Sequence, residues 1–437
     1  MALSRYSATS RYRAQLRIVD DLLALEEALR SYRRRAKRLR AKEAAISPAT
    51  ESSDARLAAR ARARLSDLQS RSRAYEQCIQ VLRYGRWLYR YIGDGIAWRS
   101  YRYGRRAIRA LAAKQPVPFL STRERGKPEL RFLRAVRALG PRWFPLLHDI
   151  TNCLRTGDVT IFKAGRFVCL VELKGNRAMI LSDSTPSHRG RPSGRAGRQV
   201  RRTAQVLDFL ETGDLGTLDA ELAGGRALQT ESPERHHFAA LSAVIAAARR
   251  RGYAFRAPDP GIIYLAWRPP DENIDESIQR ACAAQPDFFA SPGTFRAITP
   301  RYEQNHPGLP VTAMQLPIRA MLDLLFGRIA VVCMVNFRQV EDYCHARGVP
   351  LHFDFQGQHK FRIMLRAEGL EAEVLEGIWN RLILEALDLD SFVGLALTLM
   401  HHLDLSDPAA LEPTIRPLGA WVAGISPDAS KSTREPT

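Results

Sequence analysis

Two unbroken heptad runs at the N-terminus constrain this chain more than any other feature. Apolar or small side chains alternate at four-three spacing from Ile18 to Leu39, and again from Ala61 to Leu82. Residues 46–54, which include Pro48, break the pattern between the runs and are too short to form a domain. We therefore predict two antiparallel helices that form a coiled-coil hairpin.

The net charge favours a polyanionic partner. The chain has 437 residues and a formal net charge of +20, and residues 1–114 carry 27 Lys and Arg against 10 Asp and Glu. Concentrated positive charge binds polyphosphate through counterion release. We expect nucleic acid, with DNA favoured over RNA. An anionic membrane is a weaker candidate, because the cations are mostly arginine and no strong apolar face accompanies them.

Length and composition favour two or three domains of a mixed fold, α+β or α/β. We predict a basic helical coiled-coil arm over residues 1–115, a central α/β core over 116–213, a mixed α/β region over 214–426 and a disordered tail over 427–437. The six cysteines lack C-x-x-C spacing and read as reduced thiols. With no apolar run of spanning length and no secretory signal, we expect an intracellular, cytoplasmic protein.

Aromatic and arginine residues interleave after the second heptad run, between Tyr84 and Arg109. Aromatic faces stack on bases while guanidinium groups bind phosphate, so this segment is a candidate nucleic-acid platform. The candidate binding residues are Arg86, Trp87, Arg90, Arg102 and Arg105. In the slightly favoured alternative, the aromatics dock the hairpin onto the next domain. The cluster from Arg33 to Arg38 near the hairpin tip has a similar alternative, a solvated helix face.

A second hairpin, of strands, is predicted over Gly157–Lys174. Asp158 begins one apolar strand, Ala164-Gly165-Arg166 forms the turn, and Glu172-Leu173-Lys174 ends the second strand. Paired residue numbers then sum to about 330, which sets Asp158 opposite Glu172 with both side chains on one face. Lys174 follows two residues later on that face. A slip of one residue would destroy the alignment.

This acidic hairpin resembles the PD-(D/E)XK nuclease superfamily, with Asp158 as the first acid and Glu172-Leu173-Lys174 as the E-x-K signature. The resemblance covers about residues 116–213 and implies a restriction-endonuclease-like core. It implies that Asp158, Glu172 and the Leu173 carbonyl hold Mg²⁺ or Mn²⁺, and that Lys174 orients the attacking water. The chain departs from the pattern in having glycine, not proline, before Asp158.

The resemblance implies further site residues on the flanking helices. Glu129 matches the acid that some members carry on the preceding helix, although Glu124 competes for that role. Gln199 and Arg202 have the Q-x-x-R form found after the hairpin in RecB-like members, and i,i+3 spacing sets them on one helix face. The basic loop over 182–198 adds Arg195 and Arg198 as candidate nucleic-acid ligands.

His148 lies just before the hairpin and is a weaker candidate for a third metal or base group; a helix-end packing role is favoured. The C-terminal half carries less information. Expected elements there are a helix from Ser232-Pro233 to Arg250, strands over 262–267 and 328–335, a helix capped by Asn336, and helices over 374–387 and 391–402.

Three hypotheses follow from the sequence. The leading one is a Mg²⁺-dependent endonuclease that hydrolyses DNA and serves restriction, repair or phage defence. The second is a non-catalytic nucleic-acid-binding or scaffold protein with a structural E-x-K hairpin. In the third, the coiled coil docks a partner protein such as an ATPase or methyltransferase, or a second copy of the chain. Sequence leaves open whether the site is active and whether cutting is sequence-specific.

Overall fold

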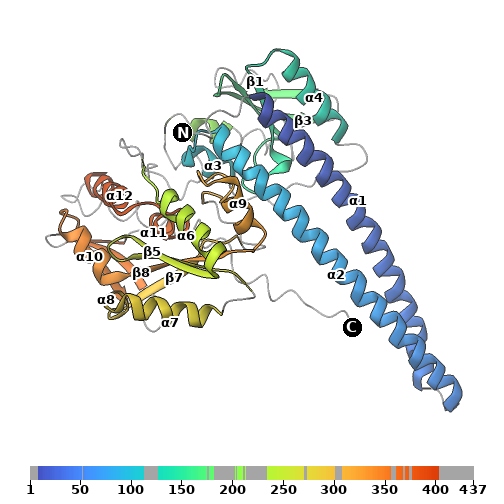
Figure 1. Ribbon diagram of the computed structural model, residues 1–437. Helices are drawn as coiled ribbons and strands as arrows, with labels where there is room; N and C mark the ends of the chain where they lie inside the picture. The colour runs from blue at the N-terminus through green and yellow to red at the C-terminus, as the bar shows by residue number, and fades with distance from the viewer. Residues whose placement is uncertain are drawn as a thin grey trace. The chain divides into compact units, whose positions relative to one another are not determined.

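A computed structural model shows a mixed α+β protein with a long N-terminal helical hairpin followed by antiparallel sheets with interspersed helices (Figure 1). It divides into two compact units, Met1–Thr203 with Tyr302–Asn305, and Ala204–Arg301 with His306–Thr437. The structure describes residues 8–51, 53–112, 126–174, 177–181, 202, 204–209, 212, 234–269, 273–300, 308–355, 361–367, 370–373 and 376–402.

The predicted helical hairpin is confirmed. It consists of α1 (Ala8–Ile46), a short 3-10 turn η1 (Ser47–Glu51) and α2 (Ala55–Ser100). The heptad positions face inward, because Ile18, Leu22 and Leu29 are all at most 5% exposed. Asp54 caps α2 by accepting the backbone N–H groups of Arg56 and Leu57, which satisfies donors at the helix start. We call this hairpin the arm.

A four-stranded antiparallel sheet follows the arm in the order β1-β2-β3-β4. Its elements, with the helices that precede it, are α3 (Arg105–Ala112), α4 (Gly126–Ala138), β1 (Trp143–Leu147), η2 (His148–Ile150), β2 (Val159–Lys163), β3 (Arg166–Lys174) and β4 (Arg177–Leu181). The predicted helix and acidic hairpin are present, whereas β1 and β4 were not predicted. Residues 202, 204–209 and 212 are helical, in agreement with the helix expected there.

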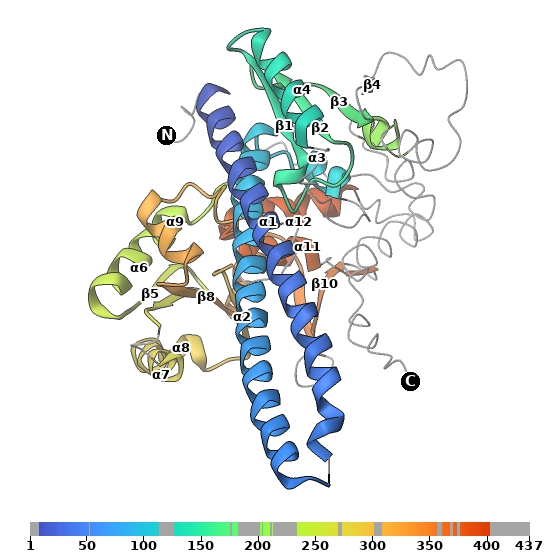
Figure 2. The same cartoon turned by 90° about the vertical axis from the view of Figure 1, so that its right-hand side faces the viewer.

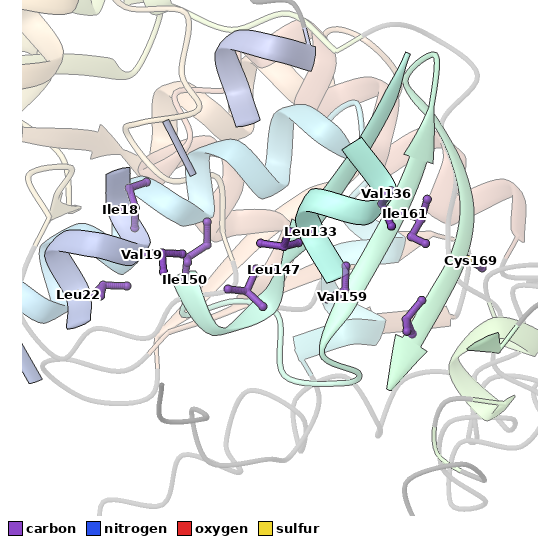
Figure 3. Packing of buried hydrophobic residues seen from close by; sticks show 11 residues of the cluster. Ile18, Val19, Leu22, Leu133, Val136, Leu147, Ile150, Val159, Ile161 and Cys169 are labelled. Carbon is purple, nitrogen blue, oxygen red and sulfur yellow. The ribbon is translucent and has the colours of Figure 1, made fainter. Parts of the chain in front are cut away.

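The arm and this sheet share one hydrophobic core. Figure 3 shows Ile18, Val19 and Leu22 of α1 beside Leu147 and Ile150, with the α4 side chains packed on those of the sheet. The buried cluster continues through Leu133, Val136, Val159, Ile161, Cys169 and Val171. The arm predicted to end at residue 115 is therefore built into the same compact unit as the sheet that follows it.

The second unit has two more antiparallel sheets, in the orders β5-β6-β8-β7 and β11-β10-β9. Its strands are β5 (Tyr253–Asp259), β6 (Ile262–Trp267), β7 (Gly293–Ala297), β8 (Ala330–Asn336), β9 (Leu351–Phe355), β10 (Phe361–Ala367) and β11 (Leu370–Glu373). Its helices are α6 (Phe238–Arg251), α7 (Ile274–Ala284), α8 (Pro286–Phe289), α9 (Ile318–Leu325), α10 (Phe337–His345), α11 (Glu376–Leu384) and α12 (Leu389–His402).

Predictions for the second unit are confirmed in part. The Asn336 side chain caps α10 by accepting the N–H of Gln339, as expected. The alanine-rich helix begins later than predicted, because His237 is the N-cap of α6 and residues 234–236 are not helical. Ser232 and Pro233 lie outside the described residues, as do the loop 182–198 and the tail 427–437. No helix in the described part of the chain has the length and apolar character needed to cross a bilayer.

Candidate functional site

The acidic hairpin has the predicted register at its Asp158 end but not at its turn. Val159 pairs with Val171 and Thr160 with Leu170, so each pair of numbers sums to 330, whereas Phe162 pairs with Phe167 and Lys163 with Arg166, which sum to 329. A β-bulge between these two stretches supplies the shift of one residue. Asp158 comes directly before β2 and leaves the regular ladder, since its N–H donates to the Val171 carbonyl, but its carboxylate bonds Leu173 and so lies next to Glu172 in the sequence of β3. Side chains alternate along a strand, which gives Glu172 the same face as Leu170 and Thr160. The odd-numbered residues of this hairpin face the core shared with the arm.

Asp158 is held at the point where three strands meet. Its carboxylate Oδ2 accepts the backbone N–H of Leu173 at 2.6 Å. Its own N–H donates to the Val171 carbonyl at 3.0 Å, and its carbonyl accepts the N–H of His148 at 2.9 Å. The side chain therefore continues the β2–β3 ladder where β2 has no further residue to pair with Leu173.

The backbone of Leu173 faces the same edge as Asp158. The N–H and C=O groups of one strand residue point to the same side, and successive residues point to opposite sides. Because the Leu173 N–H bonds Asp158, the Leu173 carbonyl also faces the β2 edge. Glu172 beside it is 3% exposed. Lys174 is the last residue of β3, and its side chain lies outside the described parts.

The acidic end of the sheet lies on the side from which the arm projects. Near the start of β1, Arg137 Nη1 donates to the Trp143 carbonyl and Nη2 to Thr9 Oγ1 of α1. Further along both elements, the Gln15 amide bonds the Pro145 carbonyl at 2.8 Å and the Leu147 N–H at 2.9 Å. The strand thus runs in the same direction as α1. Its Leu147 end, where Val159 begins β2 directly after Asp158, is the end nearer the arm tip.

Glu129 lies toward this same end. The last turn of α4 is tied to Trp143 through Arg137, so the helix runs back along β1 toward Leu147. Figure 3 agrees, since Leu133 lies beside Leu147 while Val136 lies beside Ile161. Glu129 occupies the first turn of α4, four residues before Leu133. The two acids of the hairpin and the acid of the helix therefore share one end of the sheet, but Glu172 lies on the face away from α4, because α4 packs on Val159, Ile161 and Val171.

A buried polar chain supports the acidic end from within. His148 Nε2 bonds Thr160 Oγ1 at 2.6 Å, and Thr160 Oγ1 bonds the Tyr101 hydroxyl at 2.7 Å. Burial lowers the pKa of His148 to about 4, which makes the imidazole neutral at pH 7. These contacts favour the packing role for His148. Sequence reasoning missed Tyr101 and Thr160, because neither residue type stands out in an apolar or aromatic run.

Most of the candidate aromatic-arginine platform is internal. Arg86 donates to Glu26 at 2.9 Å across the arm. Trp87 is 7% exposed and stacks on Tyr91, and Arg90 is 5% exposed. Burial lowers the pKa of the Arg90 guanidinium, whereas the nearby carboxylates of Asp149, Glu26 and Asp94 raise it. For these residues the structure favours the docking alternative over a nucleic-acid platform.

The remaining candidate cations are dispersed. The Arg105 guanidinium lies 5.3 Å from the ring centre of Trp98. Arg102 has a positive φ of 52° and lies beside Gly165, in the β2–β3 turn and so at the opposite end of the hairpin from Asp158. Arg202 is helical and half-buried. Gln199, Arg195 and Arg198 lie outside the described residues.

A buried aspartate that the sequence did not single out fixes the arm to the end of β1. Asp94 of α2 accepts the N–H groups of Asn152 at 2.6 Å and Cys153 at 2.9 Å. Burial raises the pKa of Asp94 to about 6 despite these bonds. Gly93 makes the approach possible, because a Cβ there would lie 1.9 Å from the Ile150 carbonyl oxygen. A Gly-Asp-Gly step inside a helical pattern was the available signal for this close approach.

Among the residues that the structure describes, no group of three or more His, Cys, Asp and Glu side chains is arranged to hold a metal ion. No protein-family model matches the chain, and comparison with curated proteins and with solved structures gives no match.

Proposed function

We propose that the protein is a metal-dependent nuclease that hydrolyses DNA, with its site at the Asp158 end of the four-stranded sheet. The observation that supports the proposal is the bond from the Leu173 N–H to the Asp158 carboxylate, which brings Asp158 to the Glu172-Leu173-Lys174 end of β3. The order of elements from α4 through β1, β2 and β3, with an acid in the first turn of α4, gives further support. The resemblance to the PD-(D/E)XK superfamily stated above assigns these residues the same roles.

The donor atoms at this end suit a hard cation. Carboxylate oxygens from Asp158 and Glu172, with the Leu173 carbonyl, form the kind of oxygen set that binds Mg²⁺ or Mn²⁺. The bond from the Leu173 N–H to Asp158 Oδ2 fixes the orientation of the carboxylate that would hold the ion. A bound Mg²⁺ would supply Lewis-acid activation of water and of the phosphoryl oxygen.

The other residues have positioning and binding roles in this proposal. The Leu173 N–H fixes the orientation of the Asp158 carboxylate, and the His148–Thr160–Tyr101 chain holds the strands behind it. Glu129 adds negative charge from α4. Lys174, as the last residue of the E-x-K signature, would orient the attacking water and offset charge on the phosphorane.

The test is cleavage of plasmid and linear duplex DNA with and without Mg²⁺. Asp158→Asn keeps an oxygen that accepts the Leu173 N–H and removes the charge. We expect this variant, Glu172→Gln and Lys174→Ala each to lower the cleavage rate by at least about 100-fold, the upper range for loss of a supporting group in a metal site. The matched control is Glu276→Gln, an exposed acid on α7.

EDTA should abolish cleavage, and binding to DNA should persist in all three variants. Cleavage at the wild-type rate by both Asp158→Asn and Lys174→Ala would refute the nuclease proposal.

One observation favours the non-catalytic alternative. Because Asp158 completes the β2–β3 ladder through Leu173, its carboxylate has a structural use that requires no metal. In that case the protein binds nucleic acid in a salt-sensitive way without metal-dependent turnover, and Glu172→Gln changes nothing. The cleavage assay separates the two functions directly.

A further inference from the structure

The distal half of the arm, residues 30–76, presents a dense cationic surface. Figures 1 and 2 show α1 and α2 continuing side by side well beyond the sheet to the turn at η1. Thirteen cations are exposed there: Arg33, Arg34, Arg35, Lys37, Arg38, Arg40, Lys42, Arg56, Arg60, Arg62, Arg64, Arg71 and Arg73. Five acids accompany them, and three of these already have partners. Asp54 caps α2, Asp67 pairs with Arg64 and Arg71, and Glu76 pairs with Arg40.

The outer face of α1 carries the strongest part of this surface. Arg33, Arg34, Lys37 and Arg38 are spaced at i, i+1, i+4 and i+5, which places them on one face of the helix. That face is opposite the buried positions Ala36 and Leu39. None of the four cations makes an ion pair within the described parts of the chain. We call these four residues the arm patch.

The chemistry of the distal arm fits a phosphate backbone better than a protein or membrane surface. Eleven of the thirteen exposed cations are arginine, whose planar fork matches phosphate oxygens. Protein interfaces have an apolar centre, and membrane-bound helices have an apolar face. Within residues 30–76, Leu57 is the only large apolar side chain among the exposed ones in the described structure.

The same surface favours a duplex over a single strand. Proteins that bind single strands stack bases on exposed aromatic side chains. Tyr32 and Tyr75 are the only aromatic residues between positions 30 and 76, and they pack edge-to-face on each other, 5.7 Å apart, with both side chains half-buried. A straight two-helix rod that offers cations without stacking groups suits backbone contacts along a rigid double helix.

We infer that the arm patch binds double-stranded DNA that also passes the acidic end of the sheet. The substrate is then a duplex that the arm binds at a distance from the bond that is cleaved. This rests on the proposed function, because it joins the arm to that site. Gln15 marks the level of the acidic end on α1, and the arm patch lies 18 to 23 residues further along. At 1.5 Å per residue this is about 27–35 Å, or about 8–10 base pairs at 3.4 Å each.

The first experiment measures binding without metal, so that its result is independent of catalysis. The probe is a fluorescent 30-base-pair duplex in EDTA, titrated across a range of KCl concentrations. The arm variant combines Arg33→Gln, Arg34→Gln, Lys37→Gln and Arg38→Gln, which keeps good helix formers at exposed sites. The control variant combines Arg256→Gln, Arg296→Gln, Arg319→Gln and Arg338→Gln, four exposed arginines of the second unit, and so removes the same charge.

We expect the arm variant to lose about 100-fold in affinity at 0.1 M salt, and its salt slope to flatten by about 3–4, since each lost phosphate contact removes about 0.9. The control variant should stay within about threefold of wild type. Equal losses in the two variants, or none in the arm variant, would overturn the inference. So would a single strand or a polyglutamate peptide binding the wild type as tightly as the duplex does.

The second experiment tests whether the arm patch and the cleavage site bind the same DNA duplex. With Mg²⁺, a 10-base-pair duplex is too short to be held firmly at both places, whereas a 30-base-pair duplex reaches both. The arm variant should lower kcat/KM on the long duplex and leave it unchanged on the short one. Equal effects on both lengths would overturn the link between arm and cut. If no variant or wild type cleaves DNA but the arm variant still loses binding, the proposed function fails while the arm remains a duplex-binding surface.

Discussion

The two halves of the arm contain the same types of residue in different environments. In the distal half, Arg33, Arg34 and Arg38 are exposed and have no acid beside them. In the other half of the arm, residues 8–29 and 77–100, which we call the root, Arg90 is buried and Arg86 is bonded to Glu26. The difference arises because the root packs against the end of β1, whereas the distal half packs only on itself. A run of arginines in a sequence therefore identifies a binding surface only where nothing else covers the helix.

The largest expected effect tests how closely the root is packed. Gly93→Ala puts a Cβ 1.9 Å from a backbone oxygen of Ile150, so the unit must distort. We expect a loss of about 4 kcal/mol in the free energy of unfolding, or failure to fold, at the upper end for single substitutions. Thermal unfolding followed by circular dichroism gives the measurement.

Gly85→Ala in the same helix is the matched control. A Cβ there meets only Leu25 at 3.6 Å, an ordinary contact. Because alanine favours helix, this variant should gain up to about 1 kcal/mol. Equal changes at the two glycines would show that the root is no more tightly packed than the rest of α2.

A second pair of variants compares one arginine from each half. Arg90→Gln removes a buried cation that interacts with the carboxylates of Asp149, Glu26 and Asp94, and should cost about 3 kcal/mol. Arg34→Gln, on the exposed face, should change stability by less than about 0.5 kcal/mol. Chemical denaturation of the two single variants measures both values. A small loss of stability for Arg90→Gln together with a large loss for Arg34→Gln would contradict this difference between the two halves of the arm.

The smallest effect concerns pH, and it should arise in the root and the sheet alone. Burial raises the pKa of Asp94 from 3.8 to about 6, so its contribution to stability is present at low pH and is lost as pH rises through 6. Burial lowers the pKa of His148 from 6.5 to about 4, so its contribution is present above pH 6.5 and is lost as pH falls toward 4. The two contributions oppose each other between pH 4 and pH 6.

Single variants should therefore separate them. On acidification from pH 6.5 to pH 4, Asp94→Asn should lose about 2 kcal/mol relative to wild type, because the His148 contribution is no longer offset. His148→Gln should gain stability over the same range. Melting temperatures measured across this range give both curves; parallel curves for the three proteins would contradict the assignment.

The sequence predicted those helices and strands whose own residue pattern matches the way they are buried in the fold. The heptad runs specify the arm, and the Ala164-Gly165 turn between two apolar runs specifies the acidic hairpin, without help from distant residues. The strand β1 was missed because it is short and contains Pro145, which is tolerated there since β1 lies at the edge of the sheet. The edge strands β4, β5 and β7 were missed for a related reason, since each pairs on one side only; β5 has no fully buried residue, and three of the five residues of β7 are exposed.

The site was predicted less completely than the hairpin that carries it. Spacing predicted the pairing at the Asp158 end of the hairpin, but a two-residue turn alone would give a register shifted by one residue, and the β-bulge beyond Ile161 that corrects it had no signal in the sequence. The contact between Asp158 and Leu173 could not be predicted, since it depends on where β2 begins and not on which residues β2 contains. The burial of Arg90 and Trp87 depends on the loop at 150–153 meeting Gly93, a contact between segments almost sixty residues apart.

Helix α2 continues without interruption from Ala55 to Ser100, through the tip, the paired heptads and the Gly93–Asp94 step. An unbroken helix has no hinge, so a load applied at the far turn is transmitted as bending along its whole length. The first contact that resists this bending is the one between the root and the end of β1, beside the acidic end of the sheet. Tension on a polymer bound to the far end of the arm would therefore be transmitted to the strand ends of the sheet.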